Sequence, residues 1–281
     1  MSRVAYVNGA YRPLNAAAIQ VEDRGFQFAD AVYEVWGVRD GRLLDEAGHF
    51  TRLRRTLSEL RIRWDMSDAA LRAVLRETAR RNRVRDGLVY LQISRGAAPR
   101  DHLFPAHATP TMVATAKSLK PDALEARARA GVAVISAPDT RWARCDLKTV
   151  GLLPNVLARQ AATEAGAFEA WFVDADGYVT EGTASNAWIV DAQGRLRTRE
   201  LSNRILHGVT RATLMALALE RQIPVIEQAF TLEEARAARE AFITSATNSA
   251  VPVIAIDGVP IGDGKPSPTA LRLRDAYFGA R

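Results

Sequence analysis

Short apolar strands joined by tight turns alternate with amphipathic helices along this chain of 281 residues. The strongest turn signals are the dipeptides Asn8-Gly9, Asp40-Gly41 and Asp176-Gly177. Such pairs favour the left-handed conformations that two-residue hairpins require. Leucines at helical spacing predict helices at about 46–61 and about 68–82. The alternation predicts a mixed α+β fold.

A polar stretch divides the chain into two parts. "KSLKPDALEARARAG" (117–131) contains a proline and separates two regions rich in predicted strands. We interpret it as a linker between a small N-terminal α+β domain, 1–118, and a larger C-terminal domain, 119–281. Each part is long enough to bury a core of its own.

The net charge of +6 and the isoelectric point near 9.8 allow a nucleic-acid partner as one interpretation. The arginines are, however, spread along the chain and interleaved with acidic residues, and no zinc-ligand spacing accompanies them. We therefore expect no specific nucleic-acid binding and no metal site. The N-terminal segment lacks the apolar core of a signal peptide, no apolar run has membrane-spanning length, and Cys145 is the only cysteine. These features predict a cytoplasmic protein.

Lysine is rare in this chain, because only four of its 38 Lys and Arg residues are lysines. Lys148 lies among small and apolar residues in "RWARCDLKTVGLLPN" (141–155), far from the other lysines. An ammonium group can lose its proton and attack a carbonyl carbon, which a guanidinium cannot do in a protein. Lys148 is therefore a candidate for Schiff-base chemistry, and an exposed surface lysine is the alternative.

A Schiff base with pyridoxal phosphate needs further partners, and the sequence offers candidates for each. Glu181, in "GYVTEGTASN", could hold the ring nitrogen protonated, or it could be an ordinary turn glutamate. Val209 and Thr210 follow Gly208 at a predicted helix start, where free N–H groups and the helix dipole favour phosphate. The alternative is an ordinary helix with Thr210 as its N-cap.

A second polar segment could bind a carboxylate. Arg100 and His102, in "RGAAPRDHLFP" (95–105), lie two residues apart, so that both side chains can project the same way from an extended loop. A solvated loop is the alternative interpretation. The remaining histidines have no partner in the sequence, and we interpret them as structural or solvated: His49, His107 and His207.

Seven short motifs occur in one order between residues 22 and 247: "EDRGFQFADAVYEV", "HFTRL", "RGAAPRDHLFP", "RCDLKTVGLLPNVLARQ", "VTEGTASN", "ILHGVTR" and "FITSAT". Together they resemble the fold-type IV pyridoxal-phosphate enzymes, which include branched-chain aminotransferases, D-amino-acid aminotransferases and aminodeoxychorismate lyases. The "RxH" element within "PRDH" is most similar to the D-amino-acid aminotransferases. The resemblance implies two domains, the larger a pseudo-barrel, with the cofactor between them.

The resemblance also implies roles for individual residues. Lys148 would form the Schiff base with pyridoxal 5'-phosphate and shuttle the proton, and Glu181 would be the partner of the pyridine nitrogen. Leu206 would pack on the ring. The phosphate would be held by Arg52, Val209, Thr210, Ala246 and Thr247, and the substrate carboxylate by Tyr33, Arg100 and His102.

The activity that we expect is a ping-pong transamination between D-amino acids and 2-oxo acids, of the D-alanine/2-oxoglutarate type. A branched-chain L-amino-acid aminotransferase and an aminodeoxychorismate lyase are the alternatives within the fold. The resemblance further implies a homodimer in which Arg100 and His102 reach the site of the neighbouring subunit.

The sequence departs from the family at several small residues. The usual "GDG" before the tyrosine is "ADA" here, with Ala29 and Ala31 in place of the glycines. Ala184 replaces a common serine and Ala246 a common threonine. We expect backbone N–H groups at these two positions and the hydroxyl of Thr247 to compensate.

Overall fold

The computed structural model describes residues 3–279, which fold into two compact units. Unit 1 comprises Met1–Pro121 and Leu147–Gly151, and unit 2 comprises Asp122–Asp146 and Leu152–Arg281. The domain limits expected from the sequence stay a prediction. The structure adds that the chain returns once to unit 1, in the short segment that carries Lys148.

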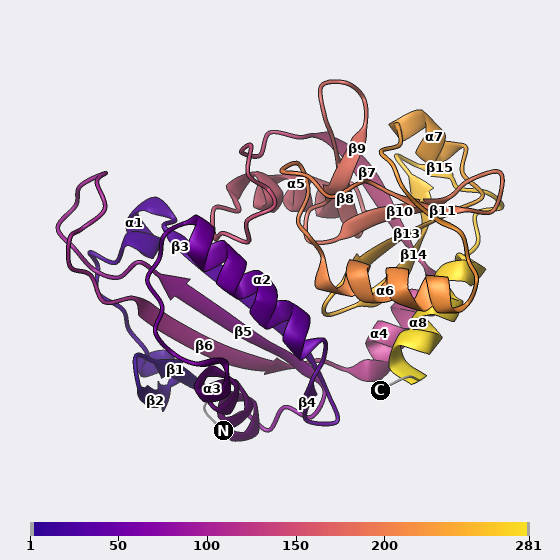
Figure 1. Ribbon diagram of the computed structural model, residues 1–281. Coiled ribbons are helices and arrows are strands. Elements are labelled where there is room, and N and C mark those ends of the chain that lie inside the picture. The colour runs from indigo at the N-terminus through magenta and orange to yellow at the C-terminus, as the bar shows by residue number, and fades with distance from the viewer. Residues whose placement is uncertain (1–2, 280–281) are drawn as a thin grey trace. The chain divides into compact units, whose positions relative to one another are not determined.

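Unit 1 is built on a six-stranded antiparallel sheet with the strand order β2-β1-β6-β5-β3-β4 (Figure 1). The hairpin predicted at Asn8-Gly9 joins β1 and β2, and both turn residues have positive φ. The elements of this unit are β1 (Val4–Val7), β2 (Ala10–Pro13), a 3₁₀ turn (Leu14–Ala16), α1 (Arg24–Phe28), β3 (Ala31–Arg39), β4 (Arg42–Leu43), α2 (Glu46–Glu59), α3 (Asp68–Arg81), β5 (Gly87–Ser94) and β6 (Thr111–Ser118).

The two faces of this sheet differ, because successive side chains of a strand point to opposite sides. One face packs under α2 and α3, and its core includes the fully buried Trp36, Leu75 and Leu91. The opposite face carries half-buried side chains, among them Tyr33 and Tyr90. One face therefore stabilises the unit, and the other is available for a site.

Ala29 ends α1 in the left-handed conformation, with φ 56° and ψ 23°. Its N–H donates to the carbonyl oxygen of Arg24, which closes the helix. The left-handed region costs a residue with a side chain about 1–2 kcal/mol, whereas glycine adopts it freely. The replacement of the family's first glycine by Ala29 therefore leaves local strain.

We predict that Ala29→Gly stabilises the protein by about 0.5–1 kcal/mol, because removing the strain outweighs the greater entropy of glycine in the unfolded chain. The midpoint temperature of thermal unfolding should rise by about 2 °C. Ala31→Gly is the matched control, since Ala31 is fully buried in β3, and this change should lower the midpoint. A lower midpoint for Ala29→Gly would show that the strain is absorbed elsewhere.

Unit 2 contains a nine-stranded mixed sheet in which the order β12-β11-β10-β13-β14-β7-β8-β9 is extended by β15 on β14. β7 lies parallel to both β8 and β14. The consecutive strands β9 and β10 contact each other although they stand far apart in the pairing order, so the sheet curls (Figure 1). This curl agrees with the pseudo-barrel that the resemblance implies.

The elements of unit 2 are α4 (Pro121–Ala130), β7 (Val132–Pro138), α5 (Leu153–Glu164), β8 (Glu169–Val173), β9 (Val179–Gly182), β10 (Asn186–Val190), β11 (Leu196–Thr198), α6 (Val209–Glu220), β12 (Val225–Glu227), α7 (Leu232–Arg236), β13 (Glu240–Ser245), β14 (Ser249–Ile256), β15 (Val259–Pro260) and α8 (Pro268–Gly279).

Most of the segment expected to be a linker forms a helix, α4, and the boundary between the two units falls within this segment, after Pro121. Proline suits the first turn of a helix, and the residues after Pro121 are mostly strong helix formers. Ala128 is completely buried, and Glu125 accepts a hydrogen bond from Arg274 of α8. Packing against the rest of unit 2 therefore stabilises a segment whose polarity alone indicated a connection.

Candidate active site

Lys148 lies beside the N-terminal half of β3 in unit 1. Its carbonyl oxygen accepts a hydrogen bond from the N–H of Tyr33 at 3.0 Å, and the next residue, Thr149, forms an isolated bridge with Val32. The side chain is half-buried, and its Nζ lies 4.0 Å from the centre of the Tyr33 ring. The structure thus brings together two predicted site residues that are far apart in the sequence.

Tyr33 belongs to a small group of polar aromatic side chains. Its ring lies 5.7 Å from that of Tyr90, whose hydroxyl donates to Gln92 Oε1 at 2.7 Å. Burial raises the pKa of Tyr90 to about 12, and the neighbouring Tyr33 adds to the effect. Tyr90 therefore remains a neutral hydrogen-bonding group near neutral pH.

Arg52, expected to bind phosphate, forms a buried ion pair with Glu34. Its Nε and Nη2 donate to the two carboxylate oxygens at 2.7 and 2.8 Å. Burial alone would raise the pKa of Glu34, but the charge and hydrogen bonds of Arg52, with that of His49, hold it at about 2. Arg52 is therefore a fixed cation whose orientation is set by Glu34.

His49 has a partner that the sequence did not indicate. Its Nδ1 lies 2.8 Å from Glu34 Oε2, and the ring is fully enclosed. Burial lowers the pKa of His49, although Glu34 opposes the shift. The group is structural, because it helps to hold the carboxylate that orients Arg52.

Arg100 and His102 are exposed in the loop between β5 and β6. The Arg100 guanidinium lies 5.1 Å from the centre of the Phe28 ring, and the His102 ring lies 5.5 Å from the same ring. The sequence argument that both side chains can gather at one place is thus supported by a shared contact. Phe28, which the sequence analysis did not single out, provides it.

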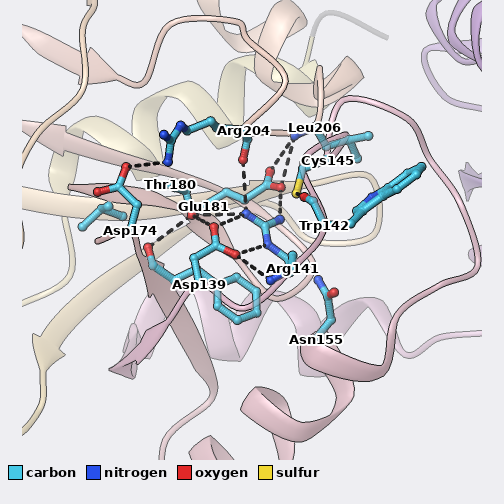
Figure 2. Close-up of polar contacts among 12 residues, drawn as sticks. Asp139, Arg141, Trp142, Cys145, Asn155, Asp174, Thr180, Glu181, Arg204 and Leu206 are labelled. Carbon is cyan, nitrogen blue, oxygen red and sulfur yellow. Dashed lines mark hydrogen bonds and ion pairs between the residues drawn. The ribbon is translucent and has the colours of Figure 1, made fainter. Parts of the chain in front are cut away.

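Glu181 lies on β9 in unit 2 and is 4% exposed. Figure 2 shows its carboxylate in an ion pair with Arg141, together with the N–H of Leu206, which donates to its two oxygens at 3.1 and 3.0 Å. Asn186 Nδ2 donates to Oε2 at 3.0 Å and also holds the carbonyl oxygen of Leu206. Two predicted site residues, Glu181 and Leu206, are therefore brought together within this unit.

Arg141, which the sequence analysis did not single out, forms the ion pair with Glu181. Its Nε and Nη2 donate to the two oxygens of Asp139 at 2.9 and 2.8 Å, so the guanidinium joins two carboxylates (Figure 2). Burial lowers the pKa of Arg141, but Asp139 and Glu181 outweigh it and raise that pKa. Burial likewise opposes ionisation of Asp139, whose pKa is nevertheless lowered by Arg141. The Arg141 guanidinium therefore holds the side chains of Asp139 and Glu181 in place.

Cys145, the single thiol, lies beside this network. Its Sγ is 3.1 Å from the carbonyl oxygen of Trp142, and burial raises its pKa to about 11. A thiol with so high a pKa is a poor nucleophile near neutral pH, which agrees with a packing role.

The start of α6 is rich in hydrogen-bond donors. The N-cap is Gly208, which provides no side-chain cap, so the interpretation of Thr210 as N-cap was wrong. Within the described chain, the buried Thr210 Oγ1 has no hydrogen-bond partner. A Cβ at position 208 would approach Asn186 Oδ1 to 1.9 Å, so only glycine fits there. The free N–H groups of this first turn suit an anion.

Ala246 and Thr247 form the half-buried turn between β13 and β14. Thr247 Oγ1 accepts a hydrogen bond from Asn248 at 3.2 Å and keeps its own hydrogen for another acceptor. The N–H of Ala184, in contrast, donates to the buried Glu169 at 2.9 Å. The backbone at position 184 is thus not the free donor that we expected.

None of the helices within residues 3–279 is long and apolar enough to cross a membrane. The same residues contain no group of three His, Cys, Asp or Glu side chains that could hold a metal ion.

The chain belongs to the class IV aminotransferases, because the model of the family described as amino-transferase class IV matches residues 31–256. It is 41% identical over 270 residues to the D-alanine aminotransferase of Bacillus licheniformis, covering 96% of this chain and 94% of that protein. It is 36% identical to the D-alanine aminotransferase of Staphylococcus haemolyticus, covering 97% and 95% of the two chains.

Solved structures share the fold. The branched-chain amino acid aminotransferase of Escherichia coli superposes with a TM-score of 0.90 at 24% identity, covering 99% of this chain and 94% of that one. A branched-chain amino acid aminotransferase of T.th., solved with N-(5'-phosphopyridoxyl)-L-glutamate, gives a TM-score of 0.89 at 26% identity and covers 100% and 94% of the two chains. The fold is therefore fold type IV, as the sequence motifs predicted.

Proposed function

We propose that this protein is a pyridoxal-phosphate-dependent transaminase that moves the amino group between D-amino acids and 2-oxo acids, of the D-alanine/2-oxoglutarate type. The placement of Lys148 over the ring of Tyr33 carries the chemical part of this proposal. The full-length similarity to two D-alanine aminotransferases supports the choice of substrate.

The groups present fit this cofactor. The orphaned hydroxyl of Thr210 and the free N–H groups at the start of α6 suit a phosphate, and Glu181 suits a protonated ring nitrogen. We assign the phosphate to Arg52, Val209, Thr210, Ala246 and Thr247, and one face of the ring to Leu206. When bound, the cofactor supplies an aldehyde for the amine and a ring that withdraws electrons from the substrate Cα.

The protein's own residues then move protons and fix orientation. Lys148 Nζ would be the group that takes the proton from the substrate Cα and delivers it again during the transfer. Glu181 keeps the ring nitrogen protonated, and Arg141 with Asn186 holds that carboxylate in place. Tyr33 limits the positions that the Lys148 amine can take.

The substrate carboxylate is assigned to Tyr33, Arg100 and His102. Cationic and hydrogen-bonding groups of this kind bind a carboxylate strongly once water is excluded. The carboxylate position decides which hydrogen at Cα faces Lys148, so this group selects the D-enantiomer.

We propose that the enzyme is a homodimer in which Arg100 and His102 serve the neighbouring subunit. Unit 1 exposes large apolar side chains that a second copy would cover, two of them next to His102 in the sequence (Leu103 and Phe104) and two just before α1 (Ile19 and Val21). The single cysteine fits the reducing cytoplasm, which is the compartment that we propose.

A half-reaction screen tests the proposed function. The enzyme with cofactor bound is mixed with single D- and L-amino acids, and the loss of its visible absorption is followed. We expect D-alanine to react roughly 100-fold faster than L-alanine, because only one enantiomer presents its Cα hydrogen to Lys148. Faster reaction with L-leucine would identify a branched-chain enzyme, and release of pyruvate from an aminochorismate without an acceptor would identify a lyase.

A further inference from the structure

The proposed carboxylate-binding pair has no polar support of its own. The side chains of Arg100 and His102 make no hydrogen bond or ion pair within the part of the chain that the structure describes, and both are exposed in the loop between β5 and β6. Their guanidinium and imidazole donors are therefore available to a ligand. Two flexible exposed side chains would bind weakly, however, unless something orders them first.

The ring of Phe28 is the contact that orders both side chains. Phe28 is the last residue of α1 and is half-buried. Its ring centre lies 5.1 Å from the Arg100 guanidinium and 5.5 Å from the His102 ring. A second guanidinium, that of Arg24, lies 4.8 Å from the same ring. One aromatic ring thus gathers two cations and an imidazole.

Arg24 fixes the backbone between the two side chains. Arg24 is only 4% exposed. Its Nη1 donates a hydrogen bond to the carbonyl oxygen of Asp101 at 2.6 Å. Asp101 stands between Arg100 and His102 in the chain. The hydrogen bond from Arg24 therefore fixes the backbone position of the loop between these two residues. The N–H of Arg24 donates in turn to Gly96 at the base of the same loop.

Arg24 is itself held by Asp30. Its Nε donates to Asp30 Oδ2 at 2.8 Å, and Arg95 donates to both oxygens of the same carboxylate at 2.7 and 2.9 Å. Burial alone would raise the pKa of Asp30, but Arg95 and Arg24 lower it. The two guanidinium groups share this carboxylate, so Asp30 holds both Arg24 and Arg95 in place beside the loop.

We propose that Arg24 and Phe28 are positioning residues for substrate recognition: they hold Arg100 and His102 in the arrangement that binds the substrate α-carboxylate. The inference rests on the proposed transaminase function and deepens it. It predicts that damage to Arg24 or Phe28 weakens carboxylate recognition and leaves the chemistry at Lys148 intact.

Two variants test this inference in the full chain with cofactor bound. Phe28→Leu keeps the apolar bulk and removes the ring, and Arg24→Lys keeps the charge but cannot bond Asp30 and the Asp101 carbonyl together. For each, we expect KM for D-alanine to rise about 10-fold with kcat within about 2-fold, because Arg100 and His102 are no longer ordered before the substrate binds and binding must order them. The half-reaction with ethylamine, which lacks a carboxylate, should be unchanged.

Phe278→Leu is the matched control. Phe278 on α8 also lies under a guanidinium, that of Arg274 at 5.0 Å, and has no part in the proposed site. It should leave KM for D-alanine unchanged. The visible absorption and thermal midpoint of each variant report its folding and cofactor content.

The outcomes separate the two proposals. Equal losses with D-alanine and ethylamine, or no loss with D-alanine in either variant, would overturn the positioning role. If unaltered protein failed to convert D-alanine at all, the proposed function would fall instead. If Phe28→Leu did not fold, Arg24→Lys decides by the same comparison.

Discussion

Lys148→Ala should lower kcat for D-alanine by about 10,000-fold or more, the upper range for loss of a group that transfers a proton in the transition state. The methyl group of alanine cannot form the covalent link with the cofactor. In the described part of unit 1, no other amine lies beside Tyr33 to replace that of Lys148. Borohydride treatment followed by mass spectrometry should then detect no cofactor attached to the chain, whereas the unaltered protein should carry one.

Lys120→Ala is the control for this experiment. Lys120 is exposed just after β6, so its loss removes a charge without touching the site. It should retain full activity and the borohydride-stable cofactor. A Lys148→Ala protein that turned over at the normal rate would end the assignment of Lys148 and, with it, the proposed mechanism.

Glu181→Gln should have the second largest effect, lowering kcat by about 100- to 1,000-fold, as expected for one electrostatic partner of the reacting system. Glutamine keeps the size of the side chain and can still accept the Leu206 N–H, but it has no charge to hold the ring nitrogen protonated. The cofactor should still attach to Lys148, which separates this variant from Lys148→Ala in the borohydride assay.

Glu220→Gln makes the same chemical change at the exposed end of α6 and should leave kcat unaltered. Arg141→Met, compared with Glu181→Gln singly and together, tests whether the two residues act as a unit. Because Arg141 is proposed to work through Glu181, the double variant should be no slower than Glu181→Gln alone. If the fold losses in kcat of the two single variants multiplied in the double variant, Arg141 would have a role separate from that of Glu181.

Local signals predicted the framework around the site, because they depend on neighbours in the chain. The hairpins predicted at Asn8-Gly9 and Asp40-Gly41 are both present. Local polarity did not indicate α4, a helix that burial of Ala128 stabilises within the segment expected to connect the domains.

Long-range partners could not be predicted in this way. Arg141 stands only seven residues before Lys148, yet its contact with Glu181 across 40 positions depends on the pairing of β7, β8 and β9 in one sheet. The pairing of Glu34 with Arg52 and His49 likewise requires α2 to pack on β3. The spacing of these residues along the chain does not predict that their side chains come into contact.

The sequence by itself determined the order of motifs and the rare lysine that identify the family and its chemistry, since these are properties of residue type and local spacing. Only the tertiary structure decided which charges meet. It places Lys148 against β3 beside Tyr33, gives Glu181 an arginine, and sets Arg24 and Phe28 under the loop of Arg100 and His102. Burial makes these contacts strong, because an ionised group removed from water is stable only with a partner.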